Sequence, residues 1–384
     1  MRALRRVLKI AALALVVFLV IGGAFLGNLL TSNAYPRPEA DGWLRLQDMP
    51  RPRGETGSTI VVPGPPGTAD ICPKGPCDPQ FVVAGGIRGL LGKTVAQVDI
   101  LDAGNGKWRA GPSLPDARHH PAAAAIDGAV YVSGGSKRAT NWKPEKNLWV
   151  LRPRSDSWDR LPDMPEARMA HQMIAANGKL YVIGGRGESS RVLIYDRTSG
   201  WTLGSAMPGP RDHLGAVLVQ GRIFAIGGRR DAVLRRVDVY DIATDTWSQG
   251  PPLPEPTSGM AAELLSDGRI HVVGGEDPGT FGGGVVDRHF ILDLPTFRWA
   301  NGPKALLPVH GAASDEIAGI LLIAGGARRQ GTLSVLAWTG VTQSFNPRET
   351  PRTVFPGPSP TPVSSPTLTT SPTATASPTG APSS

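Results

Sequence analysis

Residues 181–185 read Tyr-Val-Ile-Gly-Gly, an apolar run that ends in a glycine doublet. The same pattern occurs six times along the 384 residues of the chain. The other five copies are FVVAGG at 81–86, YVSGG at 131–135, FAIGG at 224–228, HVVGG at 271–275 and LIAGG at 322–326. The first glycines of successive doublets are 49, 50, 43, 47 and 51 residues apart. Such a period indicates a series of similar supersecondary units that pack on one another.

Three further features repeat with the doublets. Two-residue turns, such as Asp127-Gly128 and Asn177-Gly178, precede four of them, as tight hairpins require. Apolar-Tyr-Asp segments at residues 191–196 and 236–241 predict third strands. Tryptophans follow five doublets, at Trp108, Trp158, Trp201, Trp247 and Trp299. A period near 50 with Gly-Gly and a downstream tryptophan resembles the kelch repeat, and the resemblance covers residues 42–345. It implies an all-β fold, a six-bladed kelch β-propeller.

The two ends of the repeat region predict how the propeller closes. After the sixth doublet, residues 333–338 (LSVLAW) have the pattern of a third strand, and no tryptophan-proline strand follows them. Residues 43–50 (WLRLQDMP) have that missing pattern and no blade of their own. We therefore expect the N-terminal strand to complete the sixth blade, which removes an exposed sheet edge.

Composition fits this fold and argues against one class of partner. The 48 glycines and 37 prolines suit many short strands joined by tight turns. The formal net charge is +8, but four of these charges lie in the first nine residues. The rest of the chain is only weakly basic and has no recognition helix, so no nucleic-acid partner is expected.

The segments outside the propeller predict a membrane-anchored protein. Residues 1–9 are basic, and residues 10–30 carry no charge over a length that can cross a bilayer. The positive flank keeps the N-terminus in the cytoplasm and places the propeller, residues 41–345, on the extracytoplasmic side after a linker at 31–40. A signal peptide cleaved after Ser32-Asn33-Ala34 is the alternative. Residues 346–384, rich in Ser, Thr and Pro, predict a disordered tail.

The two cysteines, Cys72 and Cys77, lie in one Pro/Gly-rich loop. In an oxidising compartment such a pair favours a disulfide. A redox or metal pair is the alternative, although a zinc site needs two more ligands and no His or Cys lies nearby in the sequence.

Basic residues predict a ligand-binding face. The loops between blades and the loops after the doublets open on the same side of a propeller. Seven arginines in these loops are the ligand-binding candidates: Arg53, Arg88, Arg118, Arg168, Arg186, Arg211 and Arg229. A ring of arginines would attract anions, and Arg suits carboxylate, sulfate or phosphate. However, Arg53, Arg118, Arg168 and Arg211 each follow a proline by three residues, which belongs to the kelch pattern. The alternative, which is preferred, is that these arginines are structural and pair with a neighbouring carboxylate or with turn carbonyls.

Aromatic and histidine side chains add to this face. Trp142 lies outside the repeated tryptophan column in a loop, so it is a candidate for stacking on a ligand. His120, His171, His213 and His310 fall near the start of a first strand in four blades. A propeller separates them by a blade each, which is unlike a compact metal site, so neither a metal nor another cofactor is expected.

The resemblance leaves catalysis open. Some kelch propellers resemble galactose oxidase, but the cysteines and tyrosines of this chain do not match its copper-radical site. Exported six-bladed kelch proteins that mutarotate sialic acid share the blade number and the basic face. We therefore expect a cell-surface binding module for a glycan or protein partner, without enzymatic activity. A carbohydrate mutarotase or epimerase and a non-catalytic envelope scaffold are the alternatives.

Overall fold

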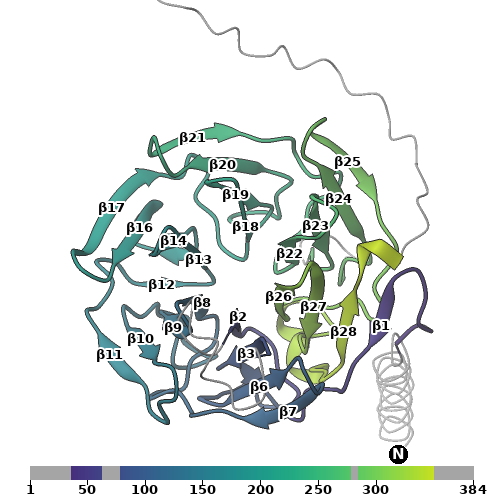
Figure 1. Cartoon of the computed structure of the whole chain (residues 1–384), viewed down its shortest axis with the longest axis horizontal. Coiled ribbons are helices and arrows are strands. Elements are labelled where there is room, and N and C mark those ends of the chain that lie inside the picture. Colours follow the sequence, from purple (N-terminus) through teal and green to yellow (C-terminus); the bar gives the residue numbers. More distant parts are fainter. Residues whose placement is uncertain (1–35, 63–77, 278–283, 350–384) are drawn as a thin grey trace, which may run out of the picture.

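The computed structural model describes residues 36–62, 78–277 and 284–349, which form a ring of six four-stranded antiparallel sheets (Figure 1). Blade one consists of β2 (Gly57–Val61), β3 (Gln80–Ala84), β6 (Val98–Asp102) and β7 (Lys107–Ala110). Blade two consists of β8 (Ala122–Ile126), β9 (Ala129–Ser133), β10 (Leu148–Leu151) and β11 (Asp159–Leu161). Blade three consists of β13 (Gln172–Ala176), β14 (Lys179–Ile183), β16 (Arg191–Asp196) and β17 (Gly200–Ala206). The next two are β18 (Gly215–Val219), β19 (Arg222–Ile226), β20 (Val237–Asp241) and β21 (Thr246–Gln249); and β22 (Ala261–Leu264), β23 (Ile270–Val273), β24 (His289–Asp293) and β25 (Arg298–Asn301).

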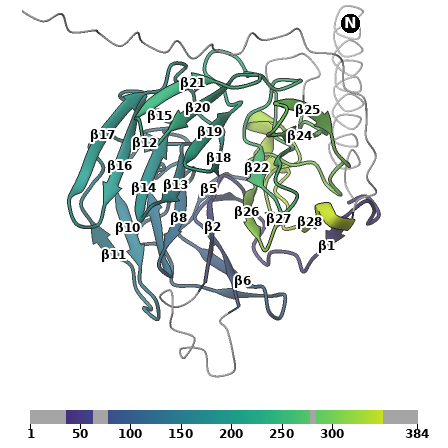
Figure 2. The same cartoon turned by 45° about the horizontal axis from the view of Figure 1, so that its top comes forward.

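The sixth blade contains strands from both ends of the propeller. It consists of β26 (Ala313–Ile317), β27 (Ile320–Ala324), β28 (Thr342–Phe345) and β1 (Trp43–Arg45), in that order. Trp43 pairs with Phe345 and Arg45 with Gln343, and Figures 1 and 2 both show β1 beside β28. The predicted closure by the N-terminal strand is therefore confirmed.

The predicted third strand of this blade is wrong. Residues within 333–338 lie in a 3-10 helix, Gly331–Leu336, and the third strand is β28, further along the chain. The Ser334 hydroxyl donates to the carbonyls of Gly331 and Arg329, which stabilises a helical turn over an apolar run that has strand-like composition. A strand-like pattern alone did not distinguish the two.

The hydrophobic core lies between the blades. Buried apolar residues form one cluster at each junction between neighbouring blades; Leu148, Val182 and Leu193, for example, join blades two and three. The repeated tryptophans fasten the outer strands across the same junctions. The indole Nε1 of Trp158 donates to Pro112 O in the preceding blade at 2.9 Å. An indole N–H also donates to a backbone carbonyl of the preceding blade in Trp108, Trp201, Trp247, Trp299 and Trp43.

Two sets of loops open on one end of the ring, which we call the mouth face. They are the loops before the inner strands, residues 51–56, 115–121, 165–171, 208–214, 254–260 and 307–312, and the described loops after the doublets, residues 86–97, 135–147, 185–190, 228–236, 275–277, 284–288 and 326–341. Bridges join the two sets, as between Asp212 and Arg229. In blade three, β12 (Arg168–Met169) pairs with β15 (Arg186–Gly187). In blade one, β4 (Ile87–Arg88) and β5 (Lys93–Thr94) form an extra hairpin.

Several sequence-based predictions fall on other parts of the chain. Residues 1–30, the Cys72–Cys77 pair and residues 350–384 of the tail lie outside the described residues. Residues 36–40 of the predicted linker are described, and Arg37 forms an ion pair with Asp287 at 2.7 Å. The first residues after 345 are also described and include a short 3-10 helix, Pro347–Glu349. Within residues 36–62, 78–277 and 284–349, no helix has the length and apolar character needed to cross a bilayer.

Candidate functional site at the mouth of the channel

A closed circuit of backbone hydrogen bonds surrounds the axis at the mouth face. Each blade contributes one residue whose N–H donates to the carbonyl of the equivalent residue in the preceding blade, at 2.6–3.0 Å. The six residues in blade order are Glu55, His120, Ala170, His213, Gly259 and Gly311. All six have positive φ, between 51° and 65°. Glycine adopts this conformation easily, whereas other residues adopt it at a cost in free energy. The presence of other residues at four of the six positions therefore calls for an explanation.

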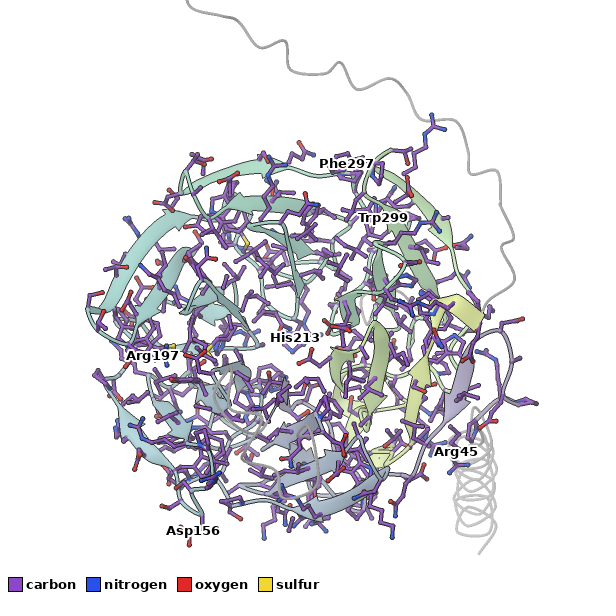
Figure 3. The ribbon with its side chains drawn as sticks, viewed as in Figure 1. Arg45, Asp156, Arg197, His213, Phe297 and Trp299 are labelled. Carbon is purple, nitrogen blue, oxygen red and sulfur yellow. The ribbon has the colours of Figure 1, made fainter. Side chains whose placement is uncertain are left out.

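Three of these side chains meet near the axis. Among the described residues, one potential ligand atom from each of Glu55, His120 and His213 lies within 4.8 Å of the other two. His120 Nε2 is 2.9 Å from Glu55 Oε2, and the His120 and His213 rings are 4.8 Å apart at their centroids. Figure 3 shows His213 near the centre of the ring, whereas its other labelled residues lie at the periphery. We expected the blades to separate the histidines too widely for a compact site. This expectation is wrong for His120 and His213, because the circuit of hydrogen bonds that carries them is narrow.

Hydrogen bonds fix the tautomers of the paired histidines in blade two. His119 Nε2 lies 3.0 Å from Arg138 O, which can only accept, so this nitrogen carries a proton. Burial, and then the neighbouring His120, lower the pKa of His119 to about 4, so the ring is neutral at pH 7 and its Nδ1 accepts. His120 Nδ1, 2.6 Å away, is therefore the donor. The remaining nitrogen of His120, Nε2, faces the Glu55 carboxylate.

His213 and Arg229 extend this group on the side of blade four. His213 Nδ1 donates to Asp212 Oδ1 at 2.5 Å, and its Nε2 accepts from an Arg229 amino group at 3.0 Å. Arg229 also donates to Glu276, which is buried. Burial lowers the pKa of His213, and the hydrogen bond to Asp212 opposes this effect.

His310 completes the group on the side of blade six. Its Nε2 donates to Arg329 O at 2.7 Å, and its Nδ1 is 3.6 Å from Glu55 Oε1. Although burial would raise the pKa of the Glu55 carboxyl, His120, His213 and His310 together hold it well below its usual range. Glu55 is therefore a carboxylate surrounded by imidazoles. We call the set Glu55, His119, His120, Asp212, His213, Arg229, Glu276 and His310 the mouth cluster.

Trp142 lies over the mouth cluster. Its ring centroid is 4.8 Å from that of His120 and 6.1 Å from that of His213, which it stacks on, and its side chain is 36% exposed. The Arg186 guanidinium lies 5.2 Å from the same indole, a cation–π contact. Part of the Trp142 surface faces solvent, so its stacking on a ligand stays a prediction.

The arginines of the Pro-x-x-Arg column are not on the surface. Arg53, Arg118, Arg168 and Arg211 are at most 2% exposed. Arg211 shows the pattern, because it donates to the carbonyls of Gly227 and Ala225 and to the carboxylate of Asp238 within its own blade. These contacts fit the alternative of structural arginines and leave no surface for a ligand. Arg53 likewise donates to carbonyls beside its glycine doublet, whereas Arg118 and Arg168 donate to Asn147 and Glu166.

The other three predicted arginines remain at the mouth face. Arg186 is half-exposed and lies 3.4 Å from Asp212, and partly buried Arg88 bonds Gln97 at 3.4 Å. Arg229 belongs to the mouth cluster, where Asp212 and Glu276 offset its charge. The mouth face is therefore less positive than the sequence suggested.

Two features of this face were missed. Reading two places beyond each column arginine would have found Glu55, His120 and His213. The second feature is the tip of the β4–β5 hairpin, where Leu90 is 71% and Leu91 is 97% exposed. Adjacent leucines between two glycines, Gly89 and Gly92, were the available signal. This exposed apolar tip is a candidate contact surface.

Below the circuit, the inner strands enclose a channel of about 410 Å³ that is acidic on one side. Glu263, Asp315 and Glu316 line it from blades five and six. Burial, and then the charge of Asp315, hold the pKa of Glu263 well above its usual range. Burial also raises the pKa of Asp315 to about 6. The channel thus combines shielded carboxylates with an imidazole-rich mouth, groups that can bind cations or exchange protons.

Comparisons with known proteins agree with this architecture. The family model described as the KLHDC2/KLHL20/DRC7 Kelch-repeats domain matches residues 122–326, more than half of the chain. Kelch-like protein terF of Aspergillus terreus is 28% identical over 290 residues, which are 70% of this chain and 62% of that protein. Alpha-scruin of Limulus polyphemus is 31% identical over 244 residues, 57% of this chain and 26% of that protein.

The chain thus spans less than two thirds of the length of these curated relatives. A solved structure titled "Structure of YjhT" covers 78% of this chain and 99% of its own, with a TM-score of 0.61. It is 17% identical, so it shows the fold alone. Six blades, the doublet at each second strand and the matching family model lead to one conclusion. The chain belongs to the kelch-repeat β-propeller family.

Proposed function

We propose that this protein is an extracytoplasmic binding module, anchored through residues 10–30, that docks a partner on its mouth face. Kelch propellers are generally protein-binding modules. The observation that carries the proposal is the pair of exposed leucines, Leu90 and Leu91, at the tip of the β4–β5 hairpin in blade one; the partly exposed Trp142 belongs to the same face in blade two. An uncharged stretch of bilayer length behind a basic N-terminus supports the placement outside the cytoplasm.

A protein segment with both apolar and acidic side chains suits this surface best. Leu90 and Leu91 offer apolar area without intramolecular packing, whereas Arg88 and Lys93 flank the same hairpin. Aromatic and basic groups are enriched in the central contacts of protein interfaces, and an aromatic ring can also stack on a sugar. Binding of a glycan should therefore depend on Trp142, and binding of a protein on Leu90 and Leu91.

The test compares Leu91→Asp with Leu203→Asp, an equally apolar, 45% exposed position on the outer strand of blade three. The purified full chain is screened against a peptide library and a glycan array. A buried anchor contributes about 2 kcal/mol, so Leu91→Asp should weaken peptide binding about 30-fold, and Leu203→Asp should not. If Leu91→Asp and Leu203→Asp bind the ligand equally well and Trp142→Ala loses binding, the mouth face binds a glycan. Binding unaffected by any of these changes would overturn the mouth-face proposal.

One observation supports a second candidate, a carbohydrate enzyme such as a sialic-acid mutarotase. A carboxylate, Glu55, faces the channel mouth within a cluster that also contains Arg229, so a base and an anion-binding group are close together. Imidazoles around a carboxylate are suited to proton transfer at a sugar ring. Any glycan found in the screen should therefore be assayed for turnover. Conversion that disappears in Glu55→Gln would select the enzyme over the binding module.

A further inference from the structure

The mouth cluster presents three donors in an arrangement that protein metal sites use. Two imidazoles and a carboxylate, from His120, His213 and Glu55, have ligand atoms within 4.8 Å of one another. Donors of a tetrahedral ion at about 2.0–2.2 Å lie about 3.4 Å apart, so the widest of these separations must shorten by more than about 1 Å when the ion binds. Two histidines and one carboxylate are a common ligand set for zinc and for other first-row transition ions.

The hydrogen bonds around these residues orient the lone pairs inward. His213 Nδ1 is bonded to the carboxylate of Asp212, which leaves Nε2 as the atom that faces the group. His120 Nδ1 is bonded to His119, whose own Nε2 is held by the carbonyl of Arg138. A ligating histidine almost always has its second nitrogen fixed in this way by an outer partner. Both histidines therefore have the outer contacts of metal ligands.

Two buried imidazole nitrogens face the Glu55 carboxylate. Among the described residues, His120 Nε2 and His310 Nδ1 are buried and make no well-formed hydrogen bond. Both lie near the Glu55 carboxylate, at 2.9 and 3.6 Å. Both nitrogens and the carboxylate oxygens are therefore placed where one cation could contact them together.

The backbone supports a functional reason for the same three residues. The circuit position requires positive φ; blades five and six have glycine there, and blade three has Ala170. Glu55, His120 and His213 adopt φ values of 57°, 53° and 54°, at a cost of roughly 1 kcal/mol each. Strained positions that carry polar side chains concentrate at functional sites.

We propose that Glu55, His120 and His213 bind a divalent first-row transition ion of the zinc class at the mouth of the channel, with His310 as a further donor. Three carboxylates, Glu55, Asp212 and Glu276, lie in the cluster. Two guanidinium groups oppose them, Arg229 within the cluster and Arg186 at 3.4 Å from Asp212, so the acidic charge still exceeds that of the arginines and suits a cation. Arg229 gives up its hydrogen bond to His213 Nε2 when the ion binds and keeps its contacts with Glu276 and Asp212. The site lies beneath Trp142, independent of the leucine hairpin.

The test is Zn²⁺ titration of the purified full chain after treatment with a chelator. Every variant also carries Cys72→Ser and Cys77→Ser, so that the cysteine pair cannot contribute. We expect one saturable site, a rise in the unfolding temperature with Zn²⁺, and a visible Co²⁺ spectrum from nitrogen and oxygen ligands. Asp212→Asn should weaken Zn²⁺ binding 10–100-fold, as loss of an outer partner does. Glu55→Gln and His120→Asn should abolish it; asparagine tolerates positive φ at position 120.

His171→Asn is the matched control, because His171 also lines the channel and is buried but lies outside the mouth cluster. It should bind Zn²⁺ like the parent, and the unfolding temperature without metal shows which variants fold. The proposal is overturned if the folded parent binds no Zn²⁺. It is also overturned if folded Glu55→Gln and His120→Asn bind as tightly as His171→Asn, since the ion would then be bound elsewhere.

Discussion

Replacing Trp43 with alanine is expected to lower the free energy of unfolding by about 3–5 kcal/mol, the usual cost of removing a buried aromatic residue. Trp43 is 1% exposed, packs 5.0 Å from the Phe345 ring and donates to Pro303 O at 3.1 Å. The substitution thus removes both the core contact of β1 and the hydrogen bond that fastens blade six to blade five. Urea unfolding of the full chain, followed by far-ultraviolet circular dichroism, measures the loss.

Leu44→Ala is the control from the same strand. Its side chain is 43% exposed, so the change should stay within about 0.5 kcal/mol. A difference of several kcal/mol between neighbouring residues of a three-residue strand would show that the ring depends on its N-terminal closure. If Trp43→Ala unfolded at the same urea concentration as Leu44→Ala, the closure would contribute little to stability.

The second large effect is expected at Arg53. Arg53→Met keeps much of the side-chain volume but should cost about 3–5 kcal/mol, because it breaks a buried ion pair and leaves buried acceptors unsatisfied. The guanidinium is fully buried, pairs with Asp99 and donates to the carbonyls of Gly85 and Val83. Arg51 also contacts Asp99, so part of the carboxylate charge stays paired. Urea unfolding again gives the change.

Arg186→Met provides the comparison on the mouth face. Its half-exposed side chain forms only a 3.4 Å surface ion pair and the contact with Trp142, together worth less than about 1 kcal/mol. The two variants separate arginines that hold the fold from arginines available to a ligand. Full stability of Arg53→Met, together with loss of partner binding, would return Arg53 to the ligand-binding group.

The repeats predicted the fold because each blade has the same local requirements. The doublets, the turns and the tryptophans recur with one period. Residues 43–50 (WLRLQDMP) have the pattern of a fourth strand but no preceding strands of their own. Residues 333–338 misled us because an apolar run is compatible with either a strand or a helical turn, and hydrogen bonds from Ser334 decide between them.

The site was harder to predict because its residues come from different blades. Glu55, His120 and His213 are 65 and 93 residues apart in sequence, and only closure of the ring brings them together. The column arginines were ambiguous in the sequence, because the kelch pattern itself contains them. A repeated charge near a binding face resembles a ligand site, but in Arg211 it satisfies carbonyls of the same blade. Burial, which no single sequence displays, distinguishes the two.

The role of the mouth face is tested most directly by hydrogen–deuterium exchange of the full chain with and without the strongest binder from the screen. Binding should slow exchange in the β4–β5 hairpin, at residues 87–94, and in the loop at 136–146 that carries Trp142. The hairpin turns at the opposite end of the ring, at residues 126–129, 177–179 and 318–320, should be unchanged. Protection confined to those turns, with the mouth face unaffected, would contradict the proposed function.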